Sequence, residues 1–244
     1  MYLLDANDPF PTFPDPQYAA SPEGIVAIGG DLSMGRLIQA YRQGIFPWYN
    51  EYEPILWWSP DPRLVLYPER LHVSRSLRKT LRTSGLTITF DQSFSEVLHG
   101  CAEPRGTTPE AAGTWLNGEM IAAYEQLHRH GLAHSAEAWD PEGRLVGGLY
   151  GVALGRAFFG ESMFSRATDA SKVAFVHTVQ ALAEAGYRLV DCQVYSDHLA
   201  RFGARELARS RFLVELDRAL AGPEPAGPWP RGSRRPETAT TGKP

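Results

Sequence analysis

The stretch HSAEAWDPEGRLVGGLYGVALGRAFFGESMF (134–164) decides the fold class, because it holds three strand-like apolar runs in close succession. The first two runs, HSAEAW and RLVGGLYGVAL, are joined by DPEG, a sequence typical of turns. A helix is expected to follow at about 169–185, before Gly186, and YRLVDCQV (187–194) is expected to be another strand. This order predicts an α+β domain in the second half of the chain.

The first half of the chain is predicted to be a smaller α/β unit with an aromatic, proline-rich loop. A helix is expected between the possible N-cap Ser33 and Gly44. The prolines of 44–63 exclude a helix there and predict a loop. The first residues are expected to be irregular and held by Phe10, Phe13 and Tyr18. Helices are also expected at 74–83, 93–102, 118–130 and 209–220, and a strand at 86–90.

We place the domain boundary in the loop 102–115, between a smaller N-terminal part and an α/β C-terminal part. Residues 1–102 are then the N-terminal domain and residues 103–221 the larger α/β domain. The remaining segment, 222–244, is rich in Pro, Gly and charge and is expected to be a disordered tail.

The composition is that of an ordinary globular protein with a formal net charge of −4 over 244 residues. This charge gives no general attraction to nucleic acid, so any such contact needs a local basic patch. The two cysteines, Cys101 and Cys192, are expected to be reduced thiols. Neither a signal peptide nor an apolar run of about 20 residues is present, which predicts a cytoplasmic protein without membrane contact.

The strand 187–194 carries the first candidate site residues. Side chains alternate along a strand, so Asp191 and Gln193 share one face and Cys192 points to the other. Two polar side chains at the end of a strand are typical of an α/β active site, although a solvated strand end fits the pattern equally well. By the same alternation Glu161 and Met163 share a face in GESMFS (160–165), where Glu161 needs a partner if it is buried.

Other catalytic patterns are absent or incomplete. HExxH, GxSxG and Walker A motifs do not occur, and the histidines lack zinc-ligand spacing. A Cys192–His nucleophile pair stays open as a minor alternative. A coenzyme A-dependent acyltransferase would need a Gly-rich loop before its main helix, whereas SRATDASK (165–172) has no glycine.

One helix is a candidate contact for nucleic acid. Its cations share a face and have no acidic residue between them: Arg75, Arg78, Lys79 and Arg82. Such a face can follow a phosphate backbone, although an ordinary solvated basic face gives the same pattern. A non-catalytic RNA-binding protein built on this helix and the aromatic loop therefore stays an alternative.

Eight short blocks, in order, resemble the leucyl/phenylalanyl-tRNA–protein transferases. They are AIGGDL (27–32), GIFPW (44–48), ILWWSPDPR (55–63), GTW (113–115), GGLYG (147–151), GESMFS (160–165), SK (171–172) and DCQ (191–193). The resemblance implies a small N-terminal domain followed by a GNAT-like α/β domain. It implies a bacterial enzyme that moves Leu or Phe, and less often Met, from Leu-tRNA or Phe-tRNA to proteins that begin with Arg or Lys, and that feeds the N-end rule degradation pathway.

The resemblance also implies roles for individual residues. Asp191, Gln193 and Glu161 would form the reaction centre, while Trp48 and Trp115 would face the terminal adenosine of the tRNA. The pocket for the transferred side chain would be lined by Leu149, Phe158, Met163 and Leu182. An aminoacyl ester is already activated, so we expect no cofactor and no metal, and we expect a monomer. Because an α-amine has a pKa near 7.7–8.0, Gln193 needs only to orient it, while Asp191 holds the Gln193 amide or takes the proton itself.

Overall fold

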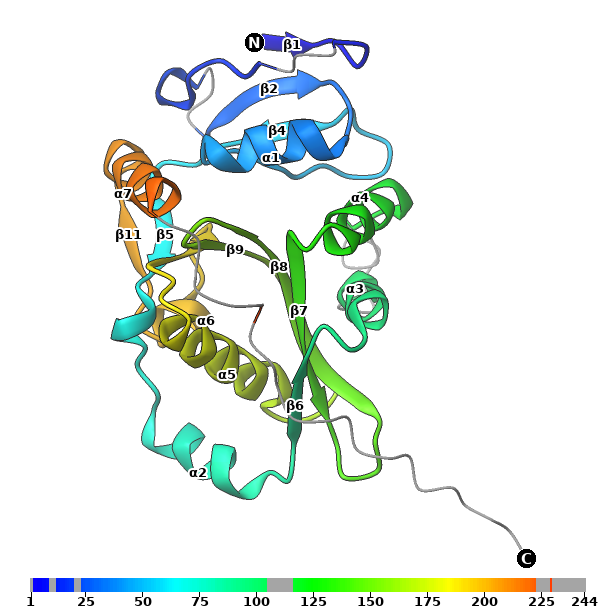
Figure 1. Cartoon of the computed structure of the whole chain (residues 1–244), viewed down its shortest axis with the longest axis vertical. Coiled ribbons are helices and arrows are strands. Elements are labelled where there is room, and N and C mark those ends of the chain that lie inside the picture. The colour runs from blue at the N-terminus through cyan, green and yellow to red at the C-terminus, as the bar shows by residue number, and fades with distance from the viewer. Residues whose placement is uncertain (1, 9–11, 20–22, 105–115, 223–228, 230–244) are drawn as a thin grey trace, which may run out of the picture.

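The computed structural model describes residues 2–8, 12–19, 23–104, 116–222 and 229. Their strands form two sheets (Figure 1). The smaller sheet has the order β1 (Tyr2–Leu4), β2 (Ile25–Gly29), β4 (Leu56–Trp58) and β3 (Phe46–Pro47). The larger sheet has the order β11 (Arg205–Leu207), β5 (Arg63–Leu66), β10 (Leu189–Gln193), β9 (Ala157–Ser165), β8 (Leu145–Leu154), β7 (Ala133–Trp139) and β6 (Thr87–Phe90).

The helices cover both faces of the larger sheet. One face packs against α1 (Met34–Arg42), α3 (Phe94–Ala102), α4 (Gly118–Arg129) and α7 (Arg209–Ala221), and α1 contacts β9 directly. The other face packs against α5 (Ala170–Glu184), α2 (Arg75–Thr83) and the short α6 (Asp197–Ala200). Two 3-10 turns lie at Pro16–Tyr18 and Pro68–Arg70. No helix within the described residues is both long and apolar enough to cross a membrane.

The predicted mixed α and β architecture is confirmed, as are the helices and strands expected after residue 74. The prediction of a loop at 44–63 is wrong, because β3 and β4 lie in this segment and pair with each other. Near the N-terminus, Phe13 is buried against Trp57 as expected, but Tyr18 is exposed and holds nothing in place. Phe10 and Trp115 lie outside the described residues.

The two sheets divide between β4 and β5, well before the boundary predicted in the loop 102–115. β5 and β6 precede that boundary in the sequence, yet both belong to the larger sheet. β5 pairs with β10, and β6 pairs with β7. Apolar periodicity cannot reveal such pairing between distant strands, so the sequence pattern did not show that β5 and β6 belong to the larger sheet.

A bulge in β9 sets the direction of its side chains. The register of β8 against β9 shifts between Tyr150 and Gly151, opposite Glu161. Because an extra residue reverses the alternation, Glu161 points to the face covered by α1 and α4, whereas Met163 points to the face covered by α5. The expectation that Glu161 and Met163 share a face is therefore wrong.

Candidate active site

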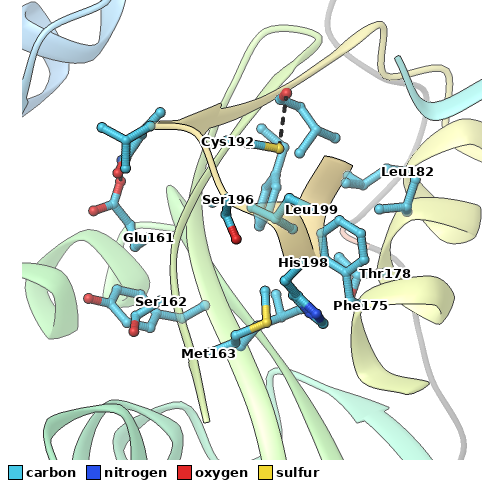
Figure 2. Close-up of a pocket in the computed structure, with 18 residues that line it drawn as sticks. Glu161, Ser162, Met163, Phe175, Thr178, Leu182, Cys192, Ser196, His198 and Leu199 are labelled. Carbon is cyan, nitrogen blue, oxygen red and sulfur yellow. Dashed lines mark hydrogen bonds between the residues drawn. The ribbon is translucent and has the colours of Figure 1, made fainter. Parts of the chain in front are cut away.

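A cavity of about 390 Å³ lies between the larger sheet and α5. All four side chains expected to hold an apolar substrate group line it: Leu149, Phe158, Met163 and Leu182. Figure 2 shows Phe175, Thr178 and Leu182 entering from α5 and Met163 entering from the sheet. The cavity can therefore bury one apolar group against mostly apolar walls.

Glu161 and Gln193 form a polar edge of this cavity. The Gln193 side chain donates from Nε2 to Glu161 Oε1 at 2.9 Å. Tyr41, on α1, donates to the same oxygen at 2.8 Å, and Tyr124, on α4, donates to Oε2 at 2.8 Å. The two tyrosine hydroxyls are also 2.7 Å apart. The carboxyl is thus held by residues from three other elements, α1, α4 and β10.

The hydrogen-bond network of Glu161, Tyr41 and Tyr124 can hold a third proton. Three oxygen pairs lie at hydrogen-bond distance, but the two hydroxyls supply only two protons. A protonated Glu161 supplies the third. Burial raises the pKa of Glu161 to about 7, against the lowering effect of the two tyrosine hydrogen bonds. Glu161 can therefore gain or lose a proton near neutral pH, as general acid–base catalysis requires.

The raised pKa of Glu161 makes a prediction about stability. The folded state holds this proton up to about pH 7, whereas the unfolded carboxyl, with a pKa of 4.5, loses it earlier. Between these values a rise in pH therefore favours the unfolded state. We expect the free energy of unfolding of the native chain to fall over this window relative to that of Glu161→Gln. Urea titrations from pH 4.5 to 8 test this, and parallel curves for the two proteins would contradict it.

Asp191 is fully buried and does not line the cavity. Arg63 donates to it from Nε to Oδ1 at 2.8 Å and from Nη2 to Oδ2 at 2.6 Å. The Oδ1 atom also accepts the backbone N–H of Gln193 at 2.9 Å. The expectation that Asp191 holds the Gln193 amide side chain is corrected, because Glu161 accepts from that amide. In this geometry Asp191 does not reach the cavity, whereas Gln193 and Glu161 line it.

Cys192 lies on the opposite face from Asp191, as the alternation along the strand predicts. It lines the cavity with the apolar side chains. Burial raises the pKa of its thiol far above the ordinary value, so the reactive thiolate is disfavoured. The geometry therefore gives no support to a Cys192 nucleophile.

The described residues that are expected to contact tRNA do not line the cavity. Trp48 is 44% exposed beside Trp58, with 5.7 Å between the ring centroids, and it does not line the cavity. The four cations of α2 are exposed, while Leu77 of the same helix is buried. A second hollow of about 350 Å³ lies at the start of α2 and shares His198 with the cavity. Ser76 and Leu77 of α2 line this hollow, whereas none of the four cations of α2 does.

Sequence reasoning missed three residues of the site. Tyr41 looked like a core residue of its helix, and Tyr124 lies on the buried face of another helix. Arg63 begins a strand that is buried along its whole length, where a cation requires a carboxylate partner. The burial of this strand indicates that Arg63 needs a carboxylate partner. The sequence could not identify this partner, because Asp191 lies 128 residues away.

The described part of the chain gives little support for a metal site or for a coenzyme A site. It contains no group of three His, Cys, Asp or Glu side chains able to hold a metal. At the start of α5, Ser165 Oγ accepts the Ser171 N–H at 3.2 Å, and Asp169 accepts from Lys172 at 2.6 Å. One backbone N–H in the first turn of α5 is thus already paired with a side chain of the protein itself.

Fold and cavity together define a mixed α/β protein that can bury one apolar group beside a titratable carboxyl. The chain belongs to the leucyl/phenylalanyl-tRNA protein transferase family, and it is an aminoacyltransferase. The family profile of that description matches residues 65–217, and the profile of the family's N-terminal domain matches residues 30–61.

Curated relatives named leucyl/phenylalanyl-tRNA–protein transferase match over nearly the whole chain. The relative from Anaeromyxobacter sp. (strain K) is 56% identical over 93% of this chain and 95% of its own. The relative from Nitrosomonas europaea is 56% identical over 93% of each chain. Among solved structures, that of L-PGS from Bacillus licheniformis has a TM-score of 0.40 and 11% identity, covering 78% of this chain and 71% of that one, a likeness too low to define a fold.

Proposed function

We propose that this enzyme transfers Leu or Phe, and less often Met, from Leu-tRNA or Phe-tRNA to the N-terminal α-amine of proteins that begin with Arg or Lys. The product carries a destabilising N-terminal residue and enters the bacterial N-end rule degradation pathway in the cytoplasm. The observation that carries this proposal is the apolar cavity whose polar edge holds Glu161 and Gln193.

The cavity receives the side chain of the transferred amino acid. Met163 is flexible and Phe158 is flat, so the same walls adapt to either Leu or Phe. A β-branched side chain adds bulk next to the reacting carbonyl, which the proposal places beside Glu161 and Gln193. Val and Ile are therefore expected to be poor donors.

The chemistry needs a carrier for one proton. The α-amine nitrogen attacks the ester carbonyl, the bond from this carbon to the ribose oxygen breaks, and the amine proton passes to that oxygen. Gln193 donates to Glu161 from Nε2, which leaves Oε1 of the same amide to accept from the amine. Glu161, with a pKa of about 7, takes the proton and returns it. The ester is already activated, so the reaction needs no cofactor.

The tRNA is proposed to use surfaces outside the cavity. Trp48 and Trp115 face the terminal adenosine, and the basic face of α2 follows the phosphate backbone. The exposure of all four cations of α2 supports this proposal. The enzyme acts as a monomer, and its larger sheet is proposed to be a GNAT-like core in which β9 and β10 form the parallel pair.

Alanine substitutions on α2 are expected to weaken tRNA binding in a salt-dependent way. Removing one cation that binds a phosphate lowers the slope of log K against log salt by about 0.7–0.9. We expect the variant with alanine at Arg75, Arg78, Lys79 and Arg82 to lower the slope by about this amount for each of these cations that binds a phosphate, as measured by binding titrations at several salt concentrations. Alanine at Arg211 and Arg218, which pair with Glu215 on α7, serves as the control and should leave the slope unchanged. Equal slopes for both variants would contradict this role of α2.

The proposed activity is tested by incubating the enzyme with radiolabelled Leu-tRNA and a peptide that begins with Arg. Label is expected in the peptide, and a matched peptide that begins with Asp should receive much less. Absence of label from the Arg peptide would rule the proposal out. Equal labelling of the two peptides would rule out the acceptor specificity.

A further inference from the structure

Arg63 is buried at the centre of the protein, where its charge needs compensation. It stands at the start of β5, next to β10, with 1% of its surface exposed. Its guanidinium carbon lies 4.8 Å from the ring centroid of Phe46 and 4.7 Å from that of Phe212. The two rings and the bidentate contact with Asp191 fix the plane of the guanidinium. A planar fork can satisfy all these contacts at once, whereas the point charge of a lysine cannot.

The backbone of Gln193 depends on the same carboxylate. Gln193 has a φ of 63°, in the left-handed region that residues other than glycine rarely adopt. The pairing of β10 with β5 is irregular between Asp191 and Gln193. The Gln193 N–H donates to Asp191 Oδ1, and this bond helps to offset the cost of the conformation. From this turn the Gln193 side chain reaches Glu161.

These contacts form a chain from Arg63 to the reaction centre. We propose that Arg63 is a positioning residue for the transfer reaction: its two-point contact orients Asp191, Asp191 holds the Gln193 N–H, and the turn so fixed sets the Gln193 amide against Glu161. The inference rests on the proposed function. It assigns the Arg63–Asp191 pair to the placement of Gln193 rather than to stability alone.

A buried ion pair that serves stability alone can be replaced by apolar side chains. The double variant Arg63→Met, Asp191→Leu removes both charges and leaves neither group buried without its partner. It also removes the acceptor of the Gln193 N–H. We therefore expect it to unfold near the denaturant midpoint of the native chain while its kcat with Leu-tRNA falls at least about tenfold. Recovery of native kcat in this variant would overturn the proposal.

Arg63→Lys provides a second test in case the double variant does not fold. It keeps the charge beside Asp191 but cannot make the two parallel hydrogen bonds. We expect a folded protein whose kcat falls about tenfold and whose KM for Leu-tRNA stays within about twofold, because the cavity walls are untouched. A native kcat in this variant, or a rise in KM alone, would overturn the proposal. The native chain is assayed first, so a failure of the proposed function appears as absent transfer before any variant is compared.

Discussion

Asp191→Ala is expected to lower the free energy of unfolding by about 3–5 kcal/mol, because it leaves the Arg63 guanidinium buried without its counter-charge. The substitution also removes the acceptor of the Gln193 N–H, so the amide beside Glu161 loses its fixed position. We expect transfer from Leu-tRNA to fall about 100-fold at a temperature where the variant is still folded, since misplacement by about 1 Å can have that effect.

The matched control for this variant is Asp217→Ala. Asp217 is an exposed carboxylate on α7, and its replacement should change the free energy of unfolding by less than about 0.5 kcal/mol. Urea titration and initial-rate assays on both variants make the comparison. If Asp191→Ala were as stable and as active as the control, the Arg63–Asp191 pair would have neither role described above.

Gly151→Ala is expected to show the second large effect. Gly151 lies on β8 opposite the bulge of β9, and an added Cβ would overlap the carbonyl oxygen of Phe159 and the ring of Phe158. The backbone cannot move away in the middle of a sheet, and Phe158 already forms one wall of the cavity. We expect destabilisation at or above the upper end of about 1–3 kcal/mol, with a lowered rate of transfer from Phe-tRNA.

Gly160→Ala is the natural comparison, because Gly160 is the register partner of Gly151. The nearest atom to a Cβ added there is the carbonyl oxygen of Asp191 at 3.6 Å, an ordinary contact. We expect this variant to keep a stability close to that of the native chain. Thermal or urea unfolding measures the stability of the two variants. Equal losses of stability would contradict the steric overlap expected at Gly151, opposite the bulge.

The elements of the second half of the chain could be predicted because their signals are local. The run from residue 134 to 164 alternates and turns as strands do, and Gly186 marks the end of the long helix. The pairing of β5 with β10 could not be predicted, because it joins segments more than a hundred residues apart. The membership of β5 and β6 in the larger sheet could not be predicted for the same reason.

The residues that line the cavity could largely be predicted from the sequence, but the contacts between the polar residues could not. The separation of Asp191 from Cys192 follows from strand alternation alone. Alternation does not predict the faces of Glu161 and Met163, because one extra residue in β9 places their side chains on opposite faces of the sheet. The contacts of Glu161 with Tyr41 and Tyr124 join helices whose tyrosines resemble ordinary core residues in the sequence. The contacts of Asp191, Gln193 and Glu161 therefore required the structure.

The central claim is that the cavity beside Glu161 and Gln193 receives the side chain of the transferred amino acid. The most direct test compares initial rates of transfer from Leu-tRNA, Phe-tRNA and Ile-tRNA to one peptide that begins with Arg. The account predicts efficient transfer of Leu and Phe and transfer of Ile at least about tenfold slower, the scale on which an apolar pocket discriminates. Equal rates for Ile and Leu would contradict it.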